Sequence, residues 1–274
     1  MKMNMNIEFH KLTGIGNDYV YFEGLKTKLP EAEIISKVSV ISDRRFGIGG
    51  DGVILVLPSK KADARMRIFN MDGSEAEICG NGVRSVMRLL NTLDPKKNKI
   101  SVETNAGIVT GEILGDDIRA KLFSPPQINS TNENIESNGQ SFTFHRVNVG
   151  NPHAVIKILD IKNFNVRKYG EPIENNLKLF PERTNVEFYE EVAAGEIRMR
   201  VWERGSGETL ACGTGAAAAA AVYRFTNNNR FNDVKVDLLG GRLIFNWTDS
   251  DFYMTGPAKY LFSGKLDLKS IETK

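Results

Sequence analysis

The stretch RIFNMDGSEAEICGNG at residues 67–82 returns in altered form as RVWERGSGETLACGTG at residues 200–215. The two stretches align without a gap, lie about half a chain length apart and hold the only two cysteines of the 274-residue chain. Five positions are identical between them: Arg67/Arg200, Glu75/Glu208, Cys79/Cys212, Gly80/Gly213 and Gly82/Gly215. This pairing predicts that one structural unit is written twice.

Further landmarks recur in the same order and at nearly the same spacing. They are Gly16-Asn17 with Gly150-Asn151, residues 100–109 with residues 234–243, and Ser124-Pro125 with Gly256-Pro257. A repeat this long is too long for a solenoid and predicts two similar lobes produced by an internal duplication. We expect a first lobe at residues 1–121, with residues 263–274 as a candidate return to it, and a second lobe at 122–262.

Most of the chain consists of short, alternating segments rich in β-branched residues, such as GVILVLP, RMRIF and KISVET, which predict strands. Helical patterns are few: residues 31–44, a counterpart near 161–170, and residues 82–93 and 215–225, which directly follow the cysteines. The pattern predicts an α+β fold in which each lobe is a mostly antiparallel sheet curled around one central helix. The polar segment 126–141 is expected to be an irregular connector.

Composition narrows the class of protein. Hydrophobic residues make up 41% and charged residues 26%, which is typical of a globular protein with a core. The net charge of +2 gives no reason to expect a nucleic-acid or membrane partner. No apolar run could span a bilayer and the N-terminus lacks a signal-peptide pattern, so we expect a cytoplasmic protein whose cysteines are free thiols.

Each cysteine ends a glycine-rich turn directly before a helix. Unpaired N–H groups and the helix dipole favour negative charge there, so we expect the pKa of each thiol to be lowered and each turn to accept a carboxylate or phosphate. Glu75 and Glu208 are expected to cap or brace these turns. The segment GIGGDG (47–52) matches a dinucleotide fingerprint, but a strand follows where a helix would be required, so we interpret it as a tight turn.

Two activated thiols supplied by duplicated lobes suit one reaction class well. One thiolate removes a proton from a stereocentre, and the opposite thiol delivers a proton to the other face. Metal binding fits less well, because CxxC and HxxxH spacings are missing and the chain has only three histidines. A dithiol redox site would ordinarily be CxxC. The pattern therefore favours proton transfer at a stereocentre by two thiols over a metal site or a dithiol redox site.

At this point several segments resemble the diaminopimelate epimerase family: LTGIGNDYV, DRRFGIGGDGVILV, FNMDGSEAEICGNG, GNPHAV, RTNVEF and VWERGSGETLACGTGA. The resemblance covers nearly the whole chain. It implies two α/β lobes with the active site in the cleft, independence of pyridoxal phosphate, and interconversion of LL- and meso-diaminopimelate for lysine and peptidoglycan precursors. A homodimer is a candidate assembly.

Carried over position by position, the resemblance implies Cys79 and Cys212 as the acid–base pair, with His153 and Glu203 assisting proton transfer. It implies a substrate-binding set of asparagines, Glu203, an arginine and the two cysteine turns: Asn17, Asn70, Asn151, Asn185, Glu203, Arg204, Gly80, Asn81, Gly213 and Thr214. Some family members carry a glutamine ligand where this chain has Gly52, so that contact is missing here or is replaced by water. His10 and His145 are expected to be structural.

Two alternatives remain open on the sequence alone. The first is a related isomerase on the same duplicated fold, of the proline or hydroxyproline racemase type or the phenazine-pathway type. The asparagines and Arg204 favour a substrate with a polar far end over a small ring. The second is a thiol switch or binding module without catalysis, which thiol titration against pH would separate from an enzyme.

Overall fold

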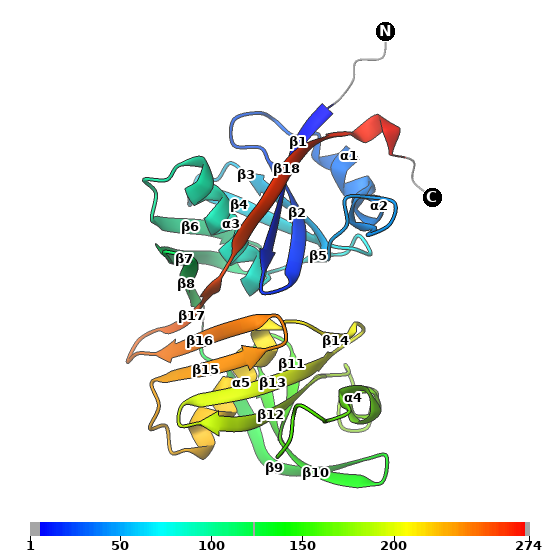
Figure 1. The fold of residues 1–274 in the computed structure, drawn as a ribbon, viewed down its shortest axis with the longest axis vertical. Coiled ribbons are helices and arrows are strands. Elements are labelled where there is room, and N and C mark those ends of the chain that lie inside the picture. The colour runs from blue at the N-terminus through cyan, green and yellow to red at the C-terminus, as the bar shows by residue number, and fades with distance from the viewer. Residues whose placement is uncertain (1–5, 123, 272–274) are drawn as a thin grey trace. The chain divides into compact units, whose positions relative to one another are not determined.

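The computed structural model describes residues 6–122 and 124–271, and the chain divides into two compact units. The first comprises Met1–Lys121 with Gly256–Lys274, and the second comprises Leu122–Thr255. Both are α+β, with many strands and few helices (Figure 1). Within the described residues, every helix is too short or too polar to cross a membrane.

The first unit is one sheet with strand order β18-β1-β2-β3-β4-β6-β7-β8, and the short β5 also pairs with β4. Only the β2–β3 and β4–β6 pairs are parallel. Its elements are β1 (Asn6–Gly14), β2 (Asn17–Glu23), α1 (Glu31–Ser36), α2 (Val38–Ser42), β3 (Gly52–Leu57), β4 (Ala64–Asn70), β5 (Glu75–Ala76), α3 (Gly80–Leu93), β6 (Lys99–Thr104), β7 (Gly107–Leu114), β8 (Asp117–Leu122), β18 (Lys259–Asp267) and the 3₁₀ turn η1 (Leu268–Ser270).

The second unit repeats this plan with strand order β9-β10-β11-β12-β13-β15-β16-β17, and β14 also pairs with β13. The parallel pairs, β11–β12 and β13–β15, fall at the corresponding places. Its elements are β9 (Gln127–Ser137), β10 (Gln140–Asn148), β11 (Pro152–Lys157), α4 (Val166–Glu174), β12 (Asn185–Ala193), β13 (Glu196–Glu203), β14 (Gly207–Thr209), α5 (Gly213–Thr226), β15 (Asp233–Leu238), β16 (Gly241–Trp247) and β17 (Phe252–Pro257).

Turn geometry at the repeated landmarks follows the same plan. Gly16 and Gly150 have φ values of 90° and 92°, and Gly107 and Gly241 have φ values of 137° and 146°. These glycines adopt a left-handed backbone that other residues rarely accept, so each sequence landmark corresponds to a conformational requirement. The predicted fold class, two lobes built on a duplicated plan with mostly antiparallel sheets, is confirmed.

Each unit has a helix against one face of its sheet: α3 in the first and α5 in the second (Figure 1). The helix α3 contacts β1, β2, β4, β6, β7 and β18. In α5, residues Ala216–Ala221 are all buried, and their small side chains let the helix approach the strands closely. The sheet therefore curls around each helix and holds the helix N-terminus in a defined place.

Both faces of strand β3 are covered by packed apolar side chains, which explains why its sequence, GVILVL, is apolar throughout. Ile54 and Val56 pack into the α3 side of the core, whereas Val53, Leu55 and Leu57 pack with residues of α1 and α2. Side chains of a strand alternate between faces, so a strand covered on both sides has no polar positions. In the second unit, α4 shares a cluster with β12 and β10.

Two sequence expectations about elements were wrong. Residues 126–141 are not an irregular connector, because Gln127–Ser137 forms β9, which pairs with β10 and gives its polar side chains an edge position. The helical pattern at 31–44 is broken at Lys37 into α1 and α2. The helices expected at 82–93 and 215–225 are present as α3 and α5, and α4 begins at Val166.

Candidate active site

Both cysteines occupy the N-cap position of a helix. The backbone N–H of Gly82 donates to Sγ of Cys79 at 3.4 Å at the start of α3, and the N–H of Gly215 donates to Sγ of Cys212 at 3.4 Å at the start of α5. The N-cap side chain thereby satisfies one of the N–H groups that a helix leaves unpaired. Both thiols are free, as expected.

The arginine and glutamate shared by the two repeated phrases bond to each other in both units. Nε of Arg67 lies 2.9 Å from Oε1 of Glu75, and Nε of Arg200 lies 2.7 Å from Oε1 of Glu208. Each pair ties the strand before the turn to the short strand that leads into the cysteine. The expectation that Glu75 and Glu208 brace these turns is confirmed.

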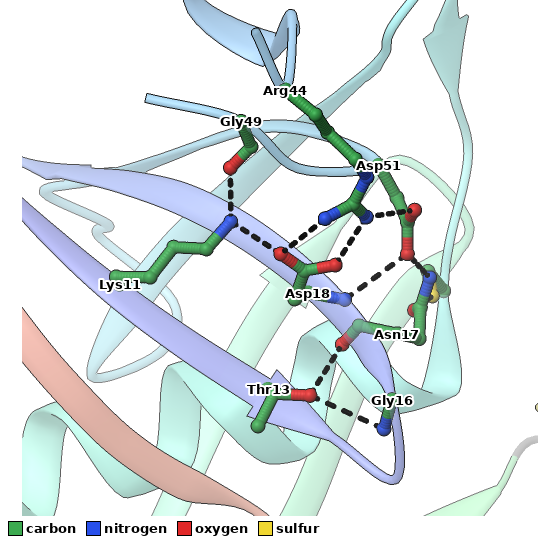
Figure 2. Close-up of polar contacts among 9 residues, drawn as sticks. Lys11, Thr13, Gly16, Asn17, Asp18, Arg44, Gly49 and Asp51 are labelled. Atoms are coloured by element: carbon green, nitrogen blue, oxygen red, sulfur yellow. Dashed lines mark hydrogen bonds and ion pairs between the residues drawn. The ribbon is translucent and has the colours of Figure 1, made fainter. Parts of the chain in front are cut away.

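In the first unit, the Cys79 thiol donates to Oδ1 of Asn17 at 3.4 Å. The other end of that amide is also held, since Nδ2 of Asn17 donates to Oδ2 of Asp51 at 2.7 Å. Figure 2 shows Asp51 reaching Asn17 on one side and Arg44 on the other. The orientation of the Asn17 amide is therefore set by a carboxylate that sequence reasoning did not single out.

A charged network supports this asparagine (Figure 2). Asp18 pairs with Lys11 at 2.5 Å and with Arg44 at 2.5 Å, and Arg44 also pairs with Asp51 at 3.0 Å. Burial raises the pKa of Asp18, but the bonds from Arg44 and Lys11 outweigh burial and leave that pKa lowered. The segment DRRFGIGGD (residues 43–51) could have indicated this network, because charged residues in a turn next to a buried strand need partners within the protein.

Arg84 lies fully buried on the first turns of α3. Its Nη2 donates to Oδ1 of Asn81 at 2.7 Å, and its Nη1 lies 3.5 Å from the carbonyl of Gly80. Burial lowers the pKa of Arg84 to about 10, so the guanidinium stays charged near neutral pH. The two turn residues after Cys79 are thus fixed by a cation, and Ala217 occupies the matching place in α5.

In the second unit, Oγ1 of Thr214 lies 3.4 Å from Sγ of Cys212. Glu203, at the end of β13, is half-buried, hydrogen-bonds to Thr209 and also bonds to Cys212. Burial raises the pKa of Glu203, although the bonds from Thr209 and Cys212 act in the opposite direction. The structure therefore brings Glu203 and Thr214 to Cys212.

His153 on β11 is fully buried and bonded at both ring nitrogens. Nδ1 lies 2.7 Å from Oε1 of Glu187, which is also fully buried, and Nε2 lies 2.9 Å from Oδ1 of Asn151. Glu187 was missed in the sequence, where it lies in the strand-like segment RTNVEF. The period-2 alternation there could have indicated an inward-facing charge.

The predicted lowering of the thiol pKa values was wrong in direction. The pKa of Cys79 is raised by burial, although the N–H groups of Gly82 and Asn81 and the charge of Arg84 oppose this rise. The pKa of Cys212 is raised further, first by burial and then by Glu203 and Glu187. Helix N-termini do favour the thiolate, but the loss of water outweighs that effect here.

Three further residues that were predicted to bind substrate hydrogen-bond to other groups of the protein: Asn70, Asn185 and Arg204. Nδ2 of Asn70 donates to Ser74 at 3.0 Å inside its own turn. Asn185 is buried and uses its amide to join the Pro152 carbonyl, at 3.3 Å, to the Arg204 N–H, at 2.9 Å. The exposed Arg204 side chain bonds to the Glu182 carbonyl at 2.9 Å.

Gly52 lies at the position where the family resemblance would allow a glutamine ligand, and its surroundings exclude any side chain. A Cβ at this position would lie 2.0 Å from the carbonyl oxygen of Phe69. The close pairing of β3 with β4 therefore requires glycine on this backbone. The ligand that a glutamine would supply has no place here.

Comparison with known sequences gives a consistent result. The sequence model described as "Diaminopimelate epimerase" matches residues 9–122 and 145–261. Diaminopimelate epimerase of Brachyspira hyodysenteriae is 41% identical, with 96% of this chain and 100% of that protein covered. Diaminopimelate epimerase of Carboxydothermus hydrogenoformans is 43% identical, with coverages of 94% and 99%.

Solved structures with low sequence identity share the fold. A phenazine biosynthesis protein of the PhzF family from Bacillus anthracis has a TM-score of 0.75 at 17% identity, with 95% of this chain and 99% of that chain covered. A hydroxyproline epimerase from Agrobacterium vitis, solved with bound trans-4-hydroxy-L-proline, has a TM-score of 0.67 at 17% identity, with coverages of 97% and 94%. At such identities the likeness concerns architecture alone.

Proposed function

Because the chain belongs to the diaminopimelate epimerase family of isomerases, we propose that it interconverts LL- and meso-2,6-diaminopimelate by a two-cysteine acid–base mechanism. The reaction would take place in the cytoplasm and supply lysine and peptidoglycan precursors. The observation that carries the mechanism is the placement of Cys79 and Cys212, each as the N-cap of a helix in equivalent positions of the two units. We call the groups around Cys79 the first half-site and those around Cys212 the second half-site. We propose that both half-sites serve the same substrate carbon, without a cofactor.

The chemistry follows from this arrangement. One sulfur, as thiolate, takes the α-proton, and the other sulfur, as thiol, gives a proton to the opposite face of the same carbon. Negative charge then develops on the substrate carboxylate. The backbone N–H groups of Gly80-Asn81 and Gly213-Thr214 at the two helix starts are suited to stabilise it.

Because the pKa of each cysteine thiol is raised, each thiol needs a route by which to lose its proton before it can act as the base. A thiol is a competent proton donor as it stands, but it acts as a base only after its own proton has moved. Glu203, bonded to Cys212 and with a raised pKa, is a suitable acceptor for that proton in the second half-site. In the first half-site, the cation of Arg84 favours the thiolate of Cys79. We therefore assign Glu203 and His153 supporting roles.

The test is isotope exchange. Purified protein incubated in heavy water with LL-diaminopimelate, without added cofactor, is expected to place deuterium at the α-carbon and to form the meso isomer. The variants Cys79→Ala and Cys212→Ala should each abolish epimerisation, because two opposed groups are needed. Substantial epimerisation by either single variant would refute the two-base scheme. The control is Arg198→Gln, which removes a surface ion pair with Glu190 and should leave the protein folded and active.

The proline and hydroxyproline racemase type is the alternative on the same fold. Only the architecture likeness to a hydroxyproline epimerase favours it, whereas the sequence relatives that cover the whole chain are named diaminopimelate epimerase. An assay that offers L-proline, trans-4-hydroxy-L-proline and LL-diaminopimelate in parallel separates the two. Turnover of the ring substrates alone would overturn our proposal.

A further inference from the structure

The two half-sites contain equivalent asparagines that are turned in opposite directions. Asn17 and Asn151 each follow a left-handed glycine; Asn17 is the first residue of β2, and Asn151 directly precedes β11. The amide of Asn17 gives its N–H groups to Asp51, at 2.7 Å, and turns its oxygen toward Cys79, at 3.4 Å. The amide of Asn151 instead turns its oxygen inward to Nε2 of His153, at 2.9 Å, which leaves its N–H groups on the other side.

Glu187 supplies a charge that the first half-site lacks. It lies on β12 at the register position that Ile54 holds on β3, because Val155 pairs with Glu187 as Tyr21 pairs with Ile54. A Cβ at Gly215 would lie 2.6 Å from Oε1 of Glu187, so this carboxylate lies against the first turn of α5. Among the described residues, Oε2 of Glu187 has no hydrogen-bond partner. A fully buried carboxylate requires a positive partner.

His153 can be that partner. Nδ1 of this ring faces Oε1 of Glu187 and Nε2 faces Oδ1 of Asn151, so a ring that carries a proton on each nitrogen donates to both oxygens. With a single proton, on Nδ1, the ring would need a donor at Nε2, and the Asn151 amide would have to turn over. Glu187, Glu203 and Cys212 are charged or titratable groups that interact electrostatically in this part of the second unit, and Glu203 also interacts with His153.

We infer that Glu187 is a positioning residue that acts through His153 to hold the Asn151 amide with its N–H groups available to a carboxylate of the substrate. This inference rests on the proposed function and deepens it. If the ring lost its second proton, Asn151 would present its carbonyl oxygen, which repels a carboxylate. Glu187 thus makes the second asparagine a hydrogen-bond donor, whereas Asp51 makes Asn17 an acceptor.

The first test needs no substrate. ¹⁵N NMR of histidine-labelled protein, with the His153 signals assigned by their loss in His153→Gln, is expected to show two protonated ring nitrogens at the assay pH. In Glu187→Gln, one ring nitrogen should become unprotonated, because the neutral amide no longer requires a cation. A singly protonated His153 in the unmodified protein would overturn the inference, whatever the enzyme turns out to act on.

The second test is kinetic. Glu187→Gln is expected to raise KM for diaminopimelate about tenfold, the usual effect of losing a hydrogen bond to a charged group, with kcat changed less than about twofold. The matched control is Glu191→Gln on the same face of β12, whose carboxylate accepts from Tyr223 at 2.8 Å and whose substitution should leave KM unchanged. An unchanged KM in folded Glu187→Gln, or an equal rise in Glu191→Gln, would contradict the positioning role. Absence of any diaminopimelate turnover in the unmodified protein would instead refute the proposed function.

Discussion

At the scale of single residues, two opposing effects act on each cysteine, and their relative size decides the protonation state. Helix N–H groups stabilise a thiolate by a limited amount, whereas burial removes the water that would stabilise it far more. The sequence revealed the first effect through the CGxG pattern. It could not reveal the second, because the burial of Cys79 depends on a hydrophobic cluster whose members, such as Tyr19 and Val109, lie far from it in the chain.

The raised thiol pKa values predict slow alkylation. In Cys212→Ser, the rate at which iodoacetamide modifies Cys79 should rise with pH and reach half its maximum above the ordinary thiol pKa of about 8.5, since only the thiolate reacts. Arg84→Met should move this midpoint to still higher pH, because the cation that favours the thiolate is removed. Arg84→Lys keeps the charge and is the control. A midpoint below the ordinary value would show that the helix N-terminus outweighs burial.

At the scale of elements, local patterns were reliable where a local cause exists. The starts of α3 and α5, the glycine hairpins at Gly107 and Gly241 and the buried strand β3 all follow from residues within one turn or strand. The strand β9 could not be foreseen in this way. Its segment is polar and rich in asparagine, and its pairing with β10 gives it a strand conformation that its own composition disfavours.

Gly52 gives a prediction at this scale. Gly52→Ala should lower the free energy of unfolding by about 2–3 kcal/mol, the usual cost of overpacking, because the new Cβ meets the Phe69 carbonyl at 2.0 Å and forces β3 away from β4. Denaturant unfolding followed by circular dichroism measures this loss. The control is Gly115→Asn, where φ is 65° and a Cβ meets nothing within 4 Å, so that asparagine fits. Equal stability of Gly52→Ala and the unmodified protein would contradict the register of these strands.

At the scale of the whole molecule, the duplication was visible in the sequence, since both copies keep their landmarks. The charges that distinguish the half-sites were only partly visible. Glu203 against Asn70 could be seen in the repeated phrases, whereas Glu187 against Ile54 becomes evident once the strands are in register. Strand β18 pairs with β1 as β9 pairs with the equivalent β10, so the sheet of the first unit is completed by residues 259–267.

This chain path predicts an unequal response to truncation. Removing residues 259–274 deletes β18 and the buried Leu268, and Lys37 loses its bonds to the carbonyls of Leu268 and Ile271, at 2.5 Å and 2.7 Å. Strand β1 then has a partner on one side only, so the first unit should exchange its β1 and β2 amides rapidly and become open to proteolysis. The second unit, which is continuous in sequence, should keep the protection of β12 and β13. Hydrogen exchange with mass spectrometry measures both units at once, with removal of residues 272–274 as the control. Equal loss of protection in the two units would contradict their separate cores, and unchanged protection of β1 would contradict its dependence on β18.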